Sequence, residues 1–130
     1  MKLLNRILIS SFLMVACVFS ATPAHADTFT MSIDGDQTVD TSVTQYVTIH
    51  FSVTFTGGGS GNVSVSQIEP CSGTVVSPSP SSFSSSGNGT ISLGPFAFGQ
   101  TGTMCFYVTG TRGSEQHTVI TTVTLVDGGN

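Results

Sequence analysis

The feature that most constrains the fold is a strict two-residue alternation in the middle of the chain. Between residues 45 and 55 the apolar side chains take every second place, and polar side chains or Tyr46 stand between them. A period of two spreads apolar residues all round a helix, whereas in a strand it places them on one face. The pattern therefore predicts a long strand at the centre of a sheet, with one buried and one wet face.

Shorter runs of the same kind lie on both sides of this strand, and no segment shows a helical period. Gly, Pro, Asn and Ser separate the runs, as they do between strands. About seven short strands without helices between them predict an all-β fold, an antiparallel β-sandwich. The first expected strand is 29–33, which stops at Asp34-Gly35 and continues after a kink through Val39 and Val43. The others are one from Val63 to before Pro70, then 74–76, 91–93, 104–109 and 117–126.

The segments between these strands also carry expectations. Residues 81–88 are predicted to be a loop anchored by Phe83, and Phe96 and Phe98 to cover one end of the core. Residues 115–117 are expected in a hairpin turn. Met104 is predicted to point inward because it shares the parity of its apolar neighbours.

The first 26 residues have the pattern of a secretory signal peptide. Lys2 and Arg6 precede an apolar run from Ile7 to about Phe19, and the small residues Ala24 and Ala26 stand at the two sites that a signal peptidase reads. We therefore expect residues 1–26 to be removed and residues 27–130 to form a single domain. An alternative cut lies at Cys17, because residues 14–17 loosely match a lipoprotein box whose cysteine becomes lipidated. The predicted location is periplasmic or extracellular.

The expected mature chain is acidic and has few charges. It retains Arg112 as its single basic residue against seven acidic ones, a formal charge of −6. Nucleic acids and anionic membranes bind through clustered Lys and Arg, so neither is an expected partner. A membrane contact is expected only through lipidation at Cys17.

Two cysteines, Cys71 and Cys105, remain after the predicted cleavage. In an oxidising compartment this pair, with no third cysteine, predicts one disulfide bond. Its loop is long enough for the bond to contribute a large share of a small domain's stability.

The second half of the chain resembles a known family. The motifs are CSGTV at 71–75, PSS at 80–82 and GTMCFYVTGT at 102–111, followed by Gly113 and the Thr/Val-rich segment 117–125. Together they are similar to the immunoglobulin-like modules of secreted bacterial and archaeal surface proteins. The resemblance covers about residues 45–126, and it implies a fold rather than an activity.

The chain departs from antibody-type domains in two ways. It has no Trp, and Cys105 has the opposite parity to Met104 and Phe106, whereas antibody domains bury their disulfide against a Trp. We therefore predict that Cys71 reaches Cys105 across neighbouring strands of one sheet, on its outer face.

Metal binding has two weak candidates in the sequence. Asp34, Asp36 and Asp40 cluster at a turn and offer oxygen ligands to calcium, although Asp-Gly is also a common turn pair. Copper would need Cys, His and Met close together, but His117 is twelve positions from Cys105 with no Met after it. No cofactor is expected.

The sequence offers few candidate catalytic residues, and no enzyme activity is expected. His50 lies on the polar face of the long strand, and neither a Ser-His-acid set nor a facing pair of carboxylates stands out. Tyr46 and Tyr107, on outward faces, are the candidate partner surface, because tyrosine offers contact area with little loss of entropy.

The sequence thus predicts an exported, non-catalytic binding or structural module of the cell envelope or extracellular space, with a role such as adhesion. Its partner would be a protein or glycan at the cell surface. One alternative is a self-assembling surface or filament subunit, because sheet edges with few charges offer unpaired backbone groups. The other alternative is a small secreted enzyme.

Overall fold

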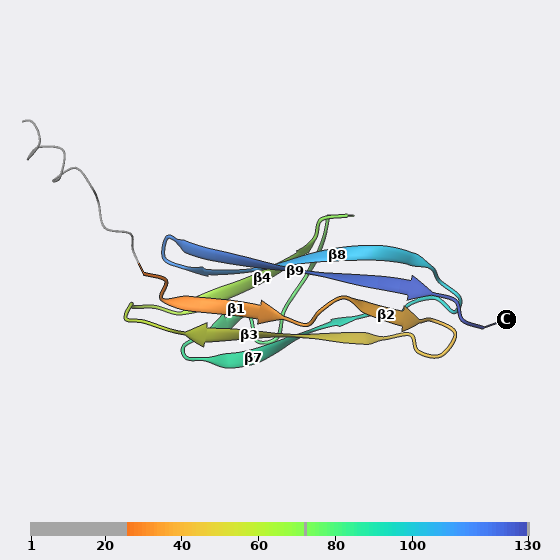
Figure 1. Ribbon diagram of the computed structural model, residues 1–130, viewed down its shortest axis with the longest axis horizontal. Coiled ribbons are helices and arrows are strands. Elements are labelled where there is room, and N and C mark those ends of the chain that lie inside the picture. The colour runs from red at the N-terminus through yellow and green to blue at the C-terminus, as the bar shows by residue number, and fades with distance from the viewer. Residues whose placement is uncertain (1–25, 72, 130) are drawn as a thin grey trace, which may run out of the picture.

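The computed structural model describes residues 26–71 and 73–129, which form two β sheets packed face to face (Figure 1). These residues contain no helix, and hence none of the length and apolarity needed to cross a membrane. The predicted lipidation site Cys17 lies outside them, as does the predicted signal peptide apart from Ala26. The strands are β1 (Phe29–Ile33), β2 (Gln37–Asp40), β3 (Val47–Phe55), β4 (Val63–Glu69), β5 (Thr74–Val76), β6 (Ser82–Phe83), β7 (Gly87–Leu93), β8 (Gly102–Arg112) and β9 (Glu115–Val126).

The smaller sheet has the order β1-β3-β7, with antiparallel pairing throughout. The alternating segment forms its central strand, β3, so this prediction is confirmed. Phe51 of β3 pairs with Gly89 of β7, and the Phe51 ring covers that glycine. A Cβ at residue 89 would lie 2.3 Å from Cζ of Phe51, so only glycine fits opposite the ring.

The larger sheet has the order β2-β9-β8-β4-β5, and β6 pairs with β4. β8 and β9 form a long hairpin that turns at Gly113 and Ser114. Gly113 has a φ of +61°, which favours glycine. Residues 115–117 therefore belong to β9, and the prediction that they form the turn is wrong.

The chain changes sheets between β1 and β2, and this adds one parallel pair to a sandwich whose other strand pairs are antiparallel, as predicted. β2 pairs in parallel with β9, because the chain crosses to the other layer without reversing direction (Figure 1). The predicted continuation to Val43 is wrong. After Asp40 the chain turns, the amides of Val43 and Thr44 donate to the Asp40 carbonyl, and Val43 is exposed.

The connectivity is that of an immunoglobulin-like sandwich. Such domains pair the second and fifth strands in one sheet and place the third, sixth and seventh together in the other. With β1 and β2 as the two halves of a divided first strand, β3 and β7 take the first pair of places. β4, β8 and β9 take the other three, so the predicted fold class is confirmed.

The inner faces of both sheets form one apolar core, with Met104 packed against it as predicted. Phe96 is buried as expected, but Phe98 is 73% exposed and does not cover the core. The Phe96 amide donates to the Gln45 carbonyl, and the turn from Ala97 to Gln100 directs Phe98 outward. Residues 81–88 are also more ordered than a loop, since they include β6 and the start of β7. The buried apolar side chains are Phe29, Val39, Ile49, Phe51, Val53, Val63, Val65, Phe83, Ile91, Leu93, Phe96, Phe106, Val108, Val123 and Leu125.

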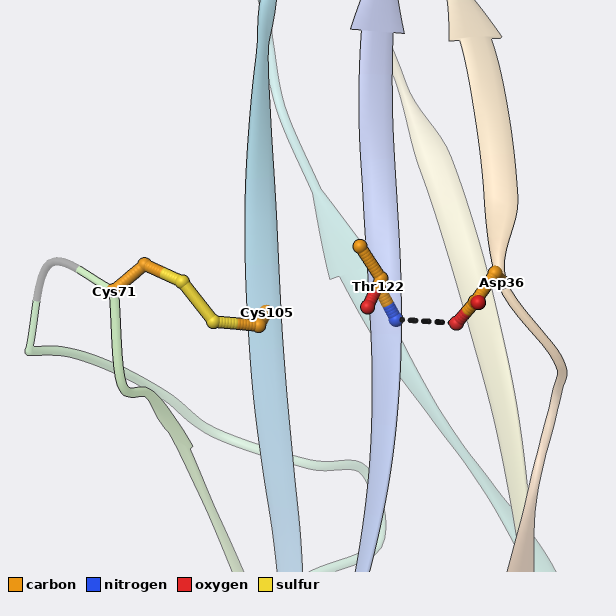
Figure 2. The surroundings of a disulfide bond; sticks show 4 residues. All are labelled: Asp36, Cys71, Cys105 and Thr122. Carbon is orange, nitrogen blue, oxygen red and sulfur yellow. Dashed lines mark hydrogen bonds between the residues drawn. A yellow bond between two sulfur atoms is a disulfide. The ribbon is translucent and has the colours of Figure 1, made fainter.

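Two neighbouring segments are tied to the larger sheet at one pair of facing residues, Cys105 of β8 and Thr122 of β9 (Figure 2). A disulfide bond joins Cys71, just after β4, to Cys105 of the neighbouring strand β8, with 6.0 Å between the Cα atoms. Cys105 pairs with Thr122 of β9, whose amide donates to Asp36 at 3.1 Å. The segments before β2 and after β4 are thereby held to the β8–β9 hairpin.

Candidate functional site

The outer face of the larger sheet has no charge on its three longest strands. The buried positions of β4 are odd-numbered, those of β8 even-numbered and those of β9 odd-numbered, so the remaining positions point outward. Each of these outward residues is neutral, and most carry a hydroxyl group. They are Ser64, Ser66 and Ile68 of β4, Thr103, Cys105, Tyr107, Thr109 and Thr111 of β8, and Gln116, Thr118, Ile120, Thr122, Thr124 and Val126 of β9.

A row of apolar side chains crosses this face. Ile68 pairs with Val75 on one side and with Tyr107 on the other, and Tyr107 pairs with Ile120. Directly opposite residues place their side chains on the same face, so the four lie in one line across β5, β4, β8 and β9. Their exposed fractions are 69% for Val75, 42% for Ile68, 40% for Tyr107 and 59% for Ile120. We call these four residues the apolar row.

The two predicted partner residues do not lie together. Tyr107 is in the apolar row, two positions from the disulfide-bonded Cys105 on the same strand. Tyr46 precedes β3 in the other sheet, is 62% exposed and covers Gly94. Tyr46 adjoins the smaller sheet and Tyr107 belongs to the larger one, so Tyr107 is the residue that joins a larger surface. A contact role for either tyrosine stays a prediction.

The three aspartates of the predicted calcium cluster turn to different partners. Asp34 Oδ2 accepts hydrogen bonds from the His50 amide and contacts its ring Nδ1 at 3.0 Å. Asp36 accepts from Thr122 as described, and Asp40 Oδ1 accepts from the amide and hydroxyl of Ser42 and from the Gly128 amide. The pKa of Asp34 is lowered chiefly by the hydrogen bond from the His50 amide. The pKa of Asp40 is lowered chiefly by the hydrogen bond from the Ser42 hydroxyl. In these positions the carboxylates act as turn and loop acceptors.

A different cluster lies at the end of the sandwich where β1 begins. Asp27, Glu115 and His117 each place one ligand-type atom within 4.8 Å of the others. Glu115 accepts hydrogen bonds from both the amide and the hydroxyl of Thr28, and the hydroxyl bond is the largest cause of its lowered pKa. The His117 ring stands edge-on to Phe29, with 4.7 Å between ring centres.

Arg112 borders a hollow of about 490 Å³ beside this cluster, which Asp27 and Glu115 also line. Its guanidinium makes structural contacts: it donates hydrogen bonds to the carbonyls of Gly59 and Gly61 and lies 4.6 Å from the centre of the Phe55 ring. Arg112 therefore fixes the glycine-rich connection between β3 and β4.

The Asp34–His50 pair resembles two members of a catalytic triad but has different surroundings. The side chain of His50 is 65% exposed. The nearby hydroxyls of Ser32 and Ser52 bond to each other. A triad requires a serine hydroxyl bonded to the histidine, and the contacts made by these two serines do not supply one.

Comparison with known proteins yields likenesses of fold. No family model matches the chain, and no curated protein matches it. A family 123 glycoside hydrolase from Clostridium perfringens superposes with a TM-score of 0.52 at 7% identity, over 78% of this chain. The chain spans 28% of the hydrolase's length. That likeness shows a shared fold and nothing about activity.

A second similar structure is AggA, the major subunit of aggregative adherence fimbriae type I from Escherichia coli. It superposes with a TM-score of 0.48 at 14% identity, over 82% of this chain and 100% of AggA. A superposition this loose carries no argument about function.

Sequence reasoning missed both the apolar row and the Asp27 cluster. Glu115 and His117 are two positions apart, a spacing that puts them on one face of a strand, so this half of the cluster was visible in the sequence. Ile68 and Ile120 also occupy even-numbered positions like the polar residues of their strands, so the alternation places both on the outer face. Which residues face each other across strands depends on register, and no local pattern reveals that.

Proposed function

We propose that the protein is an exported, non-catalytic binding or structural module of the cell envelope or extracellular space, and that the outer face of the larger sheet is its contact surface. The observation that carries this proposal is the apolar row on an otherwise neutral, hydroxyl-rich face. The disulfide bond suits an oxidising compartment outside the cytoplasm. The resemblance to immunoglobulin-like modules of secreted bacterial surface proteins supports the same role.

The face has suitable chemistry for a protein partner. Contact surfaces are depleted in charged side chains at their centre and enriched in aromatic ones, and Tyr107 stands between Ile68 and Ile120. Burying a neutral face avoids the desolvation penalty that charges impose. The hydrogen bonds and the disulfide hold the row in place, so little entropy is lost when a partner docks.

The size of the face is at the lower limit for a stable complex. The strands β2, β4, β5, β8 and β9 contain 37 residues. At about 3.3 Å per residue and about 4.8 Å between strands, they cover on the order of 600 Å². Specific complexes bury roughly 600–1,000 Å² on each partner.

The same observation favours a self-assembling subunit as the second candidate function. Two copies of residues 27–130, each with a formal charge of −6, repel each other. The outward positions of β4, β8 and β9 carry no charge, so the copies would meet there with least repulsion. A symmetric pairing of the two faces would bury both apolar rows.

Photo-crosslinking from the row tests both candidates. We would place a photoreactive residue at Ile120, with a matched control at Thr48, an exposed residue on the outer face of the smaller sheet. The cells that export the protein would then be irradiated. An adduct of defined mass from position 120, absent from position 48, supports a contact surface.

The mass of the adduct distinguishes the two functions. Twice the mass of the chain indicates self-assembly, and sedimentation of the purified protein should then show the same oligomer. Any other defined mass indicates a separate partner. Equal labelling from positions 120 and 48, or a strict monomer without any adduct, would overturn the proposal.

A further inference from the structure

The cluster at the start of β1 has the geometry of a small metal site. The Nε2 atom of His117 lies 3.4 Å from Oε1 of Glu115 and 3.8 Å from Oδ1 of Asp27. Bonds of about 2.0–2.1 Å from a tetrahedral zinc ion place neighbouring ligand atoms roughly 3.3–3.4 Å apart. Of the three separations among the ligand atoms, the one between His117 and Glu115 matches this value, and the one between His117 and Asp27 needs a shift of a few tenths of an ångström. The third, between the two carboxylates, lies within 4.8 Å, so Asp27 must move closer to Glu115 when an ion binds.

The Nε2 atom is the second observation. The atom itself is shielded from solvent, whereas the His117 side chain as a whole is 27% exposed. Its polar contacts among the described residues are the two long ones to the carboxylates, at 3.4 and 3.8 Å, and neither has the geometry of a good hydrogen bond. A buried polar atom without a partner is uncommon, because leaving water without a new hydrogen bond is costly. It points at two carboxylates, and an ion bound among the three groups would give Nε2 the partner that it lacks.

The surroundings hold the ligands as outer contacts do in metal sites. Thr28 donates to both oxygens of Glu115, which fixes the orientation of the carboxylate. Phe29 packs against the His117 ring and limits its rotation. Such contacts orient the groups that bind a metal and raise its affinity.

We propose that Asp27, Glu115 and His117 form a zinc-binding site that joins the segment before β1 to the start of β9. One imidazole nitrogen and two carboxylate oxygens suit Zn²⁺ better than Ca²⁺, which takes six or more oxygens. The two negative charges balance those of the ion, and Arg112 directs its donors at loop carbonyls instead. A fourth position is open to water from the neighbouring hollow.

Binding at this site would stabilise the fold from one end. Asp27 precedes β1 of the smaller sheet, whereas Glu115 and His117 belong to β9 of the larger one. An ion held by all three therefore links the layers, and an ion that binds only the folded chain raises its stability. This role is independent of the outer face.

Zinc titration of the processed protein, purified without a histidine tag, tests the site. We expect saturable binding of one Zn²⁺ per chain by calorimetry, a rise in the melting temperature with Zn²⁺, and a weaker response to Ca²⁺. In the NMR spectrum the His117 ring signals should shift, while those of His50 stay in place.

Two variants and a matched control make the test specific. His117→Asn and Glu115→Gln should each weaken zinc binding at least about tenfold. The control is His50→Asn, because His50 also contacts a carboxylate, and within residues 26–71 and 73–129 the two do not belong to a group of three ligand residues. Glu115→Gln keeps an acceptor for Thr28 and serves if His117→Asn fails to fold. Absence of saturable binding, an equal loss in His50→Asn, or a Ca²⁺ response as strong as that of Zn²⁺ would overturn the site.

Discussion

Removal of the disulfide bond is the perturbation whose size follows most directly from the structure. Cys71 and Cys105 close a loop of 34 positions. On the chain-entropy account, opening a loop of this length costs about 3.8 kcal/mol at 25 °C, because the unfolded chain regains its freedom. Stability margins of small domains are about 5–15 kcal/mol, so the double variant Cys71→Ser, Cys105→Ser should fold but melt roughly 15 °C or more below the parent.

Urea unfolding followed by far-ultraviolet circular dichroism measures this difference. Wild-type protein in reductant should match the double variant, since both lack the same loop closure. Thr103→Ser is the matched control, on the same strand and outer face as Cys105 but outside the bridge. We expect it to change stability by less than about 0.5 kcal/mol. A loss below about 1 kcal/mol in the double variant would refute the loop-closure reasoning.

Two further predictions concern the core and the acid response. Gly89→Ala should lower the free energy of unfolding in urea by about 1–3 kcal/mol, because the added Cβ would clash with the buried Phe51 ring. The control Gly58→Ala has open space around it and should leave the stability unchanged. Equal effects of the two variants would contradict this packing. Asp40, whose pKa lies below its ordinary 3.8 because of bonds from Ser42 and Gly128, stabilises the fold fully above that pH. This contribution is lost as the pH falls through the lower folded-state value, so urea midpoints of Asp40→Asn should fall less steeply there than those of the parent.

The sequence predicted the fold where one face of a strand is buried. The segment 45–55 and Met104 to Val108 obey the two-residue period, and the structure places them on opposing inner faces as β3 and part of β8. Burial of one face is a local property, so it leaves a local trace in the sequence. Turn residues likewise marked most strand ends, such as Pro70 after β4.

Three features depended on contacts between distant segments and could not be read locally. Asp34-Gly35 marked the break after β1, but no motif in residues 34–36 tells that the next strand, β2, pairs with β9 of the other sheet. Phe98 is as apolar as Phe96, and only the turn that follows Pro95 decides which of them is buried. The Asp27 cluster joins residues 88 and 90 positions apart, so half of it was invisible without the fold.

Sheet stability is an alternative explanation of the apolar row, to be weighed against the proposed contact surface. Cross-strand pairs such as Tyr107 with Ile120 stabilise a sheet by roughly 0.2–1 kcal/mol each, so on this explanation the row serves only to hold strands together. The strands around it are already joined by a disulfide, a long hairpin and a continuous ladder. Thr and Ser fill the neighbouring outward positions, where Thr supports a strand without exposing large apolar area. Four large apolar side chains in one line therefore exceed what sheet stability needs, and the contact surface that we propose would give the excess a role.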